Sequence, residues 1–474
     1  MSHVSRLRLA GCAGLLLVSA TGGAQRSATP DDGKEKFDHQ FQTAAADYHA
    51  GNFAAAEQRL EELAPEVPAS FEVHELLGLT YGARSEKTKA VTELELAVRL
   101  KPDSATARTN LAAALSKQGR LALAEVQFRQ AVALDPADFT ANHNLAEFYL
   151  QSNKILEAVP LLEEAQRVAP SSYDNGYDLA LAYFLTERLN DARQLTQKLL
   201  QQNNTAEVHN LMGQVEEKEG NFIRAATEFQ SAAEMEPTED NLFAWASELL
   251  LHRAYEPSIA VFQQGIRRYP RSPRLLVGQG MALYSQSKYQ DAIKSLLAAA
   301  DLDPSDARCY LFLSKSYLSS PSQADEVIER FRRYSELEPH NGLAQYYYAM
   351  SLWKGRRLDA SEVDSHQVES LLQKSIALDG TLADAHLQLG NLYAEEHDFA
   401  HSFPEYVQAL RLNPELSDAH YRLGQYYVHV GKKDDAQKEF AIYQQLESKR
   451  LDELDKKKAQ QFVYSATAGS ATNH

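Results

Sequence analysis

The chain is poor in cysteine and tryptophan, with two of each among its 474 residues. Cys12 lies in the amino-terminal segment, which leaves Cys309 as the only cysteine of the remaining sequence. Once that segment is removed an internal disulfide is impossible, which excludes a disulfide-stapled scaffold. A single thiol on a helix is most often a small buried hydrophobe, and we expect this of Cys309.

Basic residues are also scarce relative to acidic ones. The sequence has 48 Lys and Arg against 65 Asp and Glu, a net charge of −17. Such a surface repels phosphate backbones, so we do not expect nucleic acid as a partner. Arginines do cluster at 267–274 and at 330–333. Cations are favoured near helix carboxyl ends, and the alternative is a local site for an anionic polymer or a lipid headgroup.

Catalytic and metal-binding motifs are missing. There is no Gly-rich phosphate loop, no nucleophile elbow and no HExxH pattern. The nearest metal-like spacing is His397-x-x-x-His401, but the repeat register described below places His397 in a turn, so the two rings do not share a helix face. We therefore expect no enzyme activity, no catalytic residue, no metal and no cofactor.

Long apolar runs are confined to the amino terminus. Residues 1–24 contain two arginines, then an apolar run from Leu9 to Ala20 and small residues up to Ala24. This order is typical of a secretory signal peptide, and the run is too short to span a bilayer comfortably. We expect cleavage near this point, a polar linker at 25–36, and a periplasmic or secreted protein of the bacterial cell envelope.

Two alternatives for this segment remain open. One is a disordered cytosolic tail. The other is a lipoprotein signal, because Leu9-Ala10-Gly11-Cys12 matches that pattern and lipidation at Cys12 would anchor the chain to a membrane. Most of the apolar run follows Cys12 instead of preceding it, which disfavours lipidation.

An internal repeat covers almost all the rest of the chain. Its spacing is 33–35 residues, apart from one gap of 41 residues before Gly390. A small residue marks each copy: Ala44, Gly78, Ala112, Ala146, Ala180, Gly213, Ala246, Gly280, Ser314, Ala349, Gly390 and Gly424. A second small column begins Ala56, Ala90, Ala124, Ala158, and a large apolar column four residues later begins Leu60, Leu94, Phe128, Leu162.

The segment Ala105–Asp138 shows what one copy predicts. Apolar and small residues recur at helical spacing up to Gly119, and again from Leu121 to Asp135-Pro136, where proline ends the helix. Each of these two helices is apolar on one side only and too short to be stable alone. Small residues allow the paired helices to approach, and the large residue fills the space beside them.

This pattern resembles the tetratricopeptide repeat (TPR) family. A good match is Gly78-x-x-Tyr81, followed by Ala90, Leu94 and Pro102, and about twelve units fit between residues 37 and 450. The resemblance implies an all-α fold, a right-handed α-solenoid (superhelix) of antiparallel helix pairs with a C-terminal capping helix. Residues 451–474 would then hold the end of that helix and a disordered tail.

Three local features accompany the repeats. Histidines occupy one column, four residues before the small residue, and the family packs that column between units; we expect structural roles for His74, His209, His386 and His420. The 41-residue gap is explained by residues 356–366, which we expect to form a surface loop that is either merely tolerated or a contact loop. Small-residue columns are weak around Val327 and Val368, where we expect lower stability.

The family resemblance also implies where a partner binds. First helices line the concave side of TPR arrays, and aromatic or methionine side chains there suit an extended segment or an amphipathic helix of a partner protein. The candidate groove residues are Tyr177, Phe184, Phe243, Met281, Tyr284, Leu311, Tyr346, Met350 and Trp353. The alternative is that these side chains only pack against neighbouring helices.

The amino-terminal part of the same wall is polar, with Thr109, His143 and Glu147 at the corresponding places. Asn110 and Asn144 match two rungs of the asparagine ladder of some family members, and Asp178 interrupts it.

The function that we expect is a protein–protein interaction scaffold or adaptor of the cell envelope. The alternative is a carbohydrate-associated accessory protein that binds envelope polysaccharide through aromatic rings and the arginine clusters. The sequence names neither the partner nor the oligomeric state.

Overall fold

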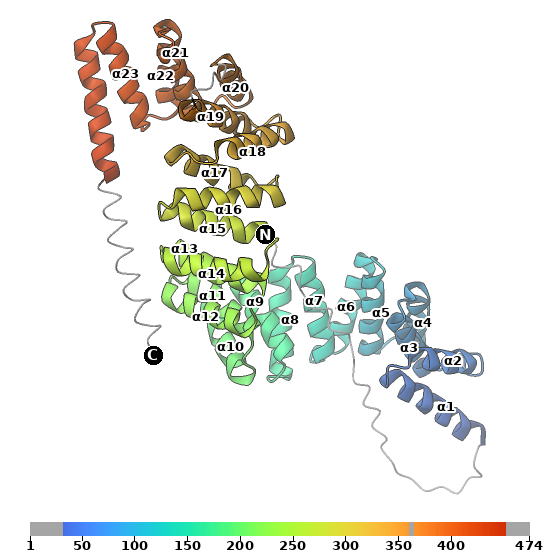
Figure 1. Cartoon of the computed structure of the whole chain (residues 1–474). Helices are drawn as coiled ribbons and strands as arrows, with labels where there is room; N and C mark the ends of the chain where they lie inside the picture. Colours follow the sequence, from blue (N-terminus) through green and yellow to red (C-terminus); the bar gives the residue numbers. More distant parts are fainter. Residues whose placement is uncertain (1–31, 360–364, 452–474) are drawn as a thin grey trace. The chain divides into compact units, whose positions relative to one another are not determined.

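The computed structural model describes residues 32–359 and 365–451. These residues form helices and connecting turns, without a strand in the described ranges (Figure 1). The chain divides into two compact units, Met1–Glu219 and Gly220–His474, and each is treated by itself below. The all-helical prediction is therefore confirmed.

Helices alternate between two roles along the chain. The first helices are α1 (Asp32–His49), α3 (Phe71–Ala83), α5 (Ala105–Lys117), α7 (Phe139–Gln151), α9 (Tyr173–Leu185), α11 (Ala206–Lys218), α13 (Glu239–Leu251), α15 (Pro273–Ser285), α17 (Ala307–Ser319), α19 (Gly342–Asp359), α21 (Ala383–Glu395) and α23 (Ser417–His429).

The second helices pack beside them. They are α2 (Phe53–Leu63), α4 (Lys87–Leu100), α6 (Leu121–Leu134), α8 (Ile155–Val168), α10 (Leu189–Gln202), α12 (Phe222–Met235), α14 (Tyr255–Arg268), α16 (Tyr289–Leu302), α18 (Ala324–Leu337), α20 (Ser365–Leu378) and α22 (Phe399–Leu412). A further helix over residues 433–451 follows α23.

Side-chain caps explain where many first helices begin. Ser104 accepts a hydrogen bond from the Ala107 backbone N–H at 3.1 Å, and Asp138 does the same for Ala141 at 2.8 Å. Ser70, Ser172, Thr205, Thr238, Ser272 and Asp306 cap α3, α9, α11, α13, α15 and α17 in the same way. These caps satisfy backbone donors that have no partner within the helix.

The turn between paired helices needs one residue with left-handed backbone. Gly119 has φ +84° there, which glycine adopts without steric cost. The same place is held by non-glycine residues in six other repeats: Ser85, Asn153, Glu187, Arg253, Ser287 and His397. His397 therefore lies in a turn, as the repeat register predicts.

The small columns pack as expected. A Cβ added to Gly280 would lie 2.5 Å from Cγ of Leu296, and one added to Gly424 would lie 2.6 Å from a ring carbon of Phe440. Ala124 is fully buried. The paired helices thus approach closely only because a small residue faces a large one.

First helices of neighbouring repeats also contact one another directly. In the first unit, α5 contacts α7, α7 contacts α9, and α9 contacts α11. In the second unit, α15 contacts both α13 and α17. Second helices of neighbouring repeats meet less often, although α16 does contact α18. The more closely spaced layer lies on the inside of a curved stack, so the first helices form the inner wall of each unit.

Several boundaries differ from the sequence predictions. α1 begins at Asp32, within the stretch expected to be a linker. α19 continues to Asp359, so the first residues of the expected loop at 356–366 are helical instead. The expected signal peptide (1–24), Cys12 and the tail after residue 451 lie outside the described residues, and those predictions stand as predictions.

Candidate partner-binding surface

The predicted groove residues all lie on first helices. In the first unit, Tyr177 and Phe184 belong to α9. In the second unit they are distributed over four helices: Phe243 on α13, Met281 and Tyr284 on α15, Leu311 on α17, and Tyr346, Met350 and Trp353 on α19.

Their exposure separates them into two groups. Met350 is 8% and Trp353 6% exposed, and both belong to a core cluster with Val368 and Leu372 of α20. These two side chains stabilise the α19–α20 pair and offer almost no surface to a partner. The other seven are half-buried or exposed, up to 36% for Leu311.

The aromatic side chains in the second unit are anchored at one edge. Tyr284 packs edge-on against Phe312 with ring centroids 5.7 Å apart, and Phe243 packs against Phe262 at 6.1 Å. Burial raises the pKa of Tyr284 and, more strongly, that of Tyr346. Phe312 escaped the sequence analysis because it lies one position beyond the column used to choose groove residues.

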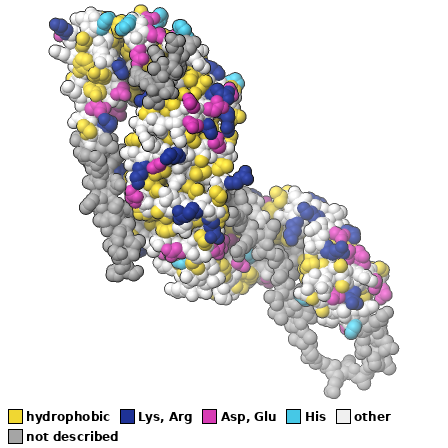
Figure 2. All heavy atoms as spheres, in the orientation of Figure 1, with side chains coloured by type: hydrophobic (Ala, Val, Ile, Leu, Met, Phe, Trp, Pro, Cys, Tyr) yellow, Lys and Arg dark blue, Asp and Glu magenta, His cyan; other side chains and the backbone are white. Residues whose placement is uncertain are grey.

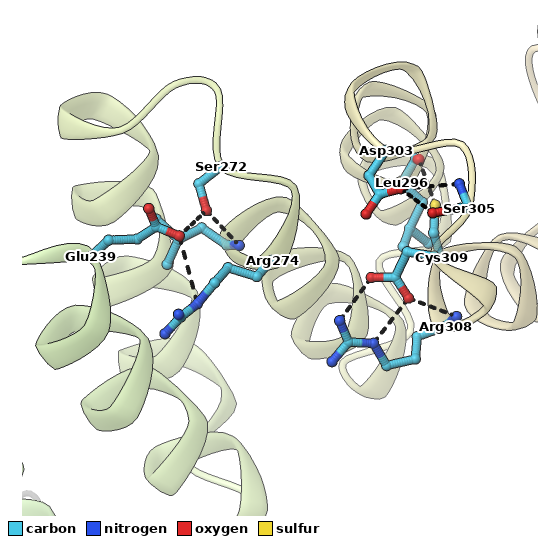
Figure 3. A network of polar contacts seen from close by, with 10 residues as sticks. Glu239, Ser272, Arg274, Leu296, Asp303, Ser305, Arg308 and Cys309 are labelled. Atoms are coloured by element: carbon cyan, nitrogen blue, oxygen red, sulfur yellow. Dashed lines mark hydrogen bonds and ion pairs between the residues drawn. The ribbon is translucent and has the colours of Figure 1, made fainter. Parts of the chain in front are cut away.

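Charge beside Phe243 is balanced within the unit. The Arg274 guanidinium lies 4.2 Å from the Phe243 ring centroid and donates to Asp240 at 2.7 Å. Arg274 Nε lies 3.6 Å from Glu239, which also accepts a hydrogen bond from Ser272 at 2.7 Å (Figure 3). The cation over this ring is held by two carboxylates.

The inner wall of the first unit is different in character. Glu75 is buried and accepts a hydrogen bond from Asn110 of the next repeat at 3.1 Å, while burial raises its pKa. Burial and nearby carboxylates raise the pKa of Asp178 to about 7. Asp178 drew no attention in the sequence beyond interrupting the asparagine column, because burial of a carboxyl is not visible from residue types.

Histidines in the repeat column have structural contacts, as predicted. His74, His386 and His420 are 6–8% exposed, and Nδ1 of each lies 2.6 Å from a glutamate of the following helix. His209 bonds Asn204 at 2.7 Å. His401 bonds Asp398 at 2.6 Å, and the described residues contain no group of three metal-ligating side chains.

Cys309 and the arginine clusters also have local partners. Cys309 is fully buried and donates to the Leu296 carbonyl at 2.9 Å (Figure 3), and burial raises its pKa to about 12. Arg330 pairs with Asp301 at 3.0 Å and Arg332 with Glu329 at 2.7 Å. Figure 2 shows basic and acidic side chains interspersed over the face in view, and not a basic patch.

A cavity of about 370 Å³ opens among α8, α9 and α10, where Leu179, Leu195 and Leu199 line it beside Gln166 and Lys198. Of the described helices, none combines the length and the apolar character that crossing a membrane requires.

Comparison with known proteins agrees with the repeat register. Tetratricopeptide repeat models match residues 150–215, and residues 76–139, 109–173 and 243–307. The TPR repeat-containing protein YpiA of Bacillus subtilis is 24% identical over 192 residues, which are 40% of this chain and 43% of YpiA. The chain thus matches less than half of that relative's length.

Two solved structures are among those similar to this chain. Pseudomonas aeruginosa PilF is 22% identical, covering 43% of this chain and 94% of that one with a TM-score of 0.37. Yeast Tom70 is 16% identical, covering 93% and 96% with a TM-score of 0.36. The repeat columns, the paired helices and the family-model matches together place this chain in the tetratricopeptide repeat family.

Proposed function

We propose that this chain is a non-catalytic scaffold that binds a segment of a partner protein on the inner walls of its units, in the cell envelope after secretion. The observation that carries the proposal is the set of half-buried side chains on successive first helices of the second unit. Phe243, Tyr284 and Tyr346 pack against the core of the unit and are half-buried, so part of each side chain is accessible to solvent. Rigid aromatic surface of this kind is what binding hot spots use.

A photocrosslinking amino acid at matched positions tests the surface. Leu311 on α17 is 36% exposed on the inner wall, and Leu337 on α18 is 55% exposed on a second helix. We expect an envelope extract to yield a discrete crosslinked protein from position 311 and not from position 337. Equal crosslinking at both positions, or crosslinking at 337 alone, would contradict the proposal.

A double variant tests the aromatic side chains themselves. Tyr284→Ala with Tyr346→Ala should weaken capture of that same protein at least tenfold while circular dichroism stays helical. Unchanged binding by the folded variant would show that the partner does not bind at this surface. The envelope location has its own test: intact-mass spectrometry of the exported protein distinguishes cleavage near Ala24 from a diacylated Cys12.

A further inference from the structure

The cavity among α8, α9 and α10 lies on the other side of α9 from the predicted groove residues. Leu179 and Tyr183 line it and, four residues apart, share one face of α9, whereas Tyr177 and Phe184 belong to the opposite face. Its volume of about 370 Å³ is within the range of about 300–1,000 Å³ that small-molecule sites occupy. The cavity is therefore a second candidate site, separate from the inner wall.

The repeat columns change at the wall of this cavity. Gly176 stands where the three preceding repeats have a side chain that bonds the carbonyl of the loop proline, namely His74, Arg108 and Asn142. The Pro170 carbonyl accepts a hydrogen bond from Gln166 Nε2 of α8 at 2.9 Å instead. Leu199 stands where the two preceding repeats have Ala131 and Ala165. This repeat thus lacks a polar side chain between its helices and has a larger apolar one.

The exchange makes the wall of the cavity apolar. A Cβ added to Gly176 would lie 2.9 Å from Cδ2 of Leu199, so the leucine occupies space that a longer side chain at 176 would need. Leu199 is 2% and Leu179 3% exposed, and the half-buried Leu195 also lines the cavity. Three leucine side chains suit an aliphatic chain, because the contact removes apolar surface from water.

The charges at the mouth of the cavity leave one cation over. Glu163 and Arg167 line the mouth, but Arg188 donates to Glu163 at 2.8 Å and Arg167 donates to Glu164 at 2.8 Å. Lys198 also lines the cavity and is exposed, and it forms no ion pair or hydrogen bond within the part of the chain that the structure describes. The uncompensated charge beside the apolar wall is therefore a single ammonium group.

We propose that this cavity binds a small aliphatic carboxylic acid. The chain would lie against Leu179, Leu195 and Leu199, and the carboxylate would accept a charge-assisted hydrogen bond from the Lys198 ammonium group. One uncompensated cation matches one negative charge on the ligand, which a carboxylate supplies at neutral pH. This site gives the chain a small-molecule ligand in addition to the partner protein of the proposed function.

Calorimetric titration of the full chain tests the chemistry of the ligand. The three probes are octanoate, octylamine and acetate, which separate the effects of the charge and of the aliphatic chain. We expect octanoate to bind at one saturable site, and octylamine and acetate to bind at least tenfold more weakly. Equal binding of octanoate and octylamine, or no binding of octanoate, would overturn the inference.

A charge-matched pair of variants tests the role of Lys198. Lys198→Glu should weaken octanoate binding at least tenfold, because it places a carboxylate where the ligand carboxylate would bind. Lys87→Glu makes the same change of charge at an exposed position of α4 and should alter binding less than twofold. Equal losses in the two variants would mean that only the net charge attracts the acid, and the inference would be wrong.

A second pair of variants tests the apolar wall. Leu195→Trp enlarges a side chain that lines the cavity, and Leu161→Trp makes the same change at the corresponding half-buried position of the preceding repeat. With both variants folded by circular dichroism, we expect only Leu195→Trp to abolish octanoate binding. Unchanged binding by folded Leu195→Trp would contradict the proposed site, as would loss of octanoate binding in Tyr284→Ala with Tyr346→Ala.

Discussion

At the scale of single residues, one position of the repeat makes the same hydrogen bond with different side chains. The residue six positions after the loop proline reaches the carbonyl of that proline. The contacts are His74 to Pro68 at 3.2 Å, Arg108 to Pro102 at 3.0 Å, Asn142 to Pro136 at 2.9 Å, Tyr310 to Pro304 at 3.1 Å and His420 to Pro414 at 3.0 Å. The sequence predicts a packed column here, but the shared acceptor is not visible in it because the five side chains are of four different types.

Tyr310 offers a clean measurement of this contact. Its side chain is fully buried, and Tyr310→Phe removes only the hydroxyl that donates to Pro304. We expect the free energy of unfolding to fall by about 1 kcal/mol, since a buried acceptor loses its donor. Urea denaturation followed by circular dichroism measures the change, with Tyr255→Phe on the half-buried start of α14 as the control. Equal midpoints for wild type and Tyr310→Phe would refute the role.

At the scale of helices, the packing of each pair depends on its small column. Ala124 of α6 is fully buried, whereas its neighbour Ala122 is exposed. Ala124→Leu should overpack the contact between α5 and α6 and cost about 1–3 kcal/mol of stability, while Ala122→Leu should change it little. Thermal unfolding compares the two variants directly. An unfolding free energy of Ala124→Leu within a few tenths of the wild type would contradict the register.

The pair α17–α18 shows how packing changes where a larger residue stands in the small-residue column. Thirteen residues separate Ser314 from Val327, against twelve between Gly280 and Ala292, so the turn has one extra residue. Val327 is also larger and β-branched where most other repeats have alanine or serine. α17 and α18 accordingly share few contacts, although α18 packs well on α19. The sequence identifies the weak small-residue column of this unit, but not the left-handed Gln323 that precedes α18.

The repeat periodicity predicts part of the candidate site. The 34-residue register places each groove residue on a first helix, as the structure has it, because periodicity fixes the helix face. Periodicity does not determine how deeply each of these side chains is buried. Trp353 and Met350 lie in the core, where they cluster with Val368 and Leu372 of α20. The raised pKa of Asp178 depends on its burial and on carboxylates of α7, α9 and α11.

At the scale of the whole molecule, stability is built from contacts between successive helices. α6 contacts α5 and α7, and α16 contacts α15 and α17. In such an array each repeat is stabilised mainly by its neighbours, and local unfolding costs less than global unfolding. The two units therefore need not unfold together, and the free energies of unfolding compared above are those of the unit that carries the substitution.

Hydrogen exchange of the Ala124→Leu variant tests whether each repeat is stabilised mainly by its neighbours. Ala124→Leu should accelerate amide exchange in α5, α6 and α7, because these helices pack directly around residue 124. Exchange in α15 and α16, which belong to the second unit, should match the wild type within error. Ala122→Leu, at an exposed position of the same helix, should leave both regions unchanged. If Ala124→Leu instead accelerated exchange equally in both units, the chain would unfold as one cooperative body and nearest-neighbour stabilisation would be wrong.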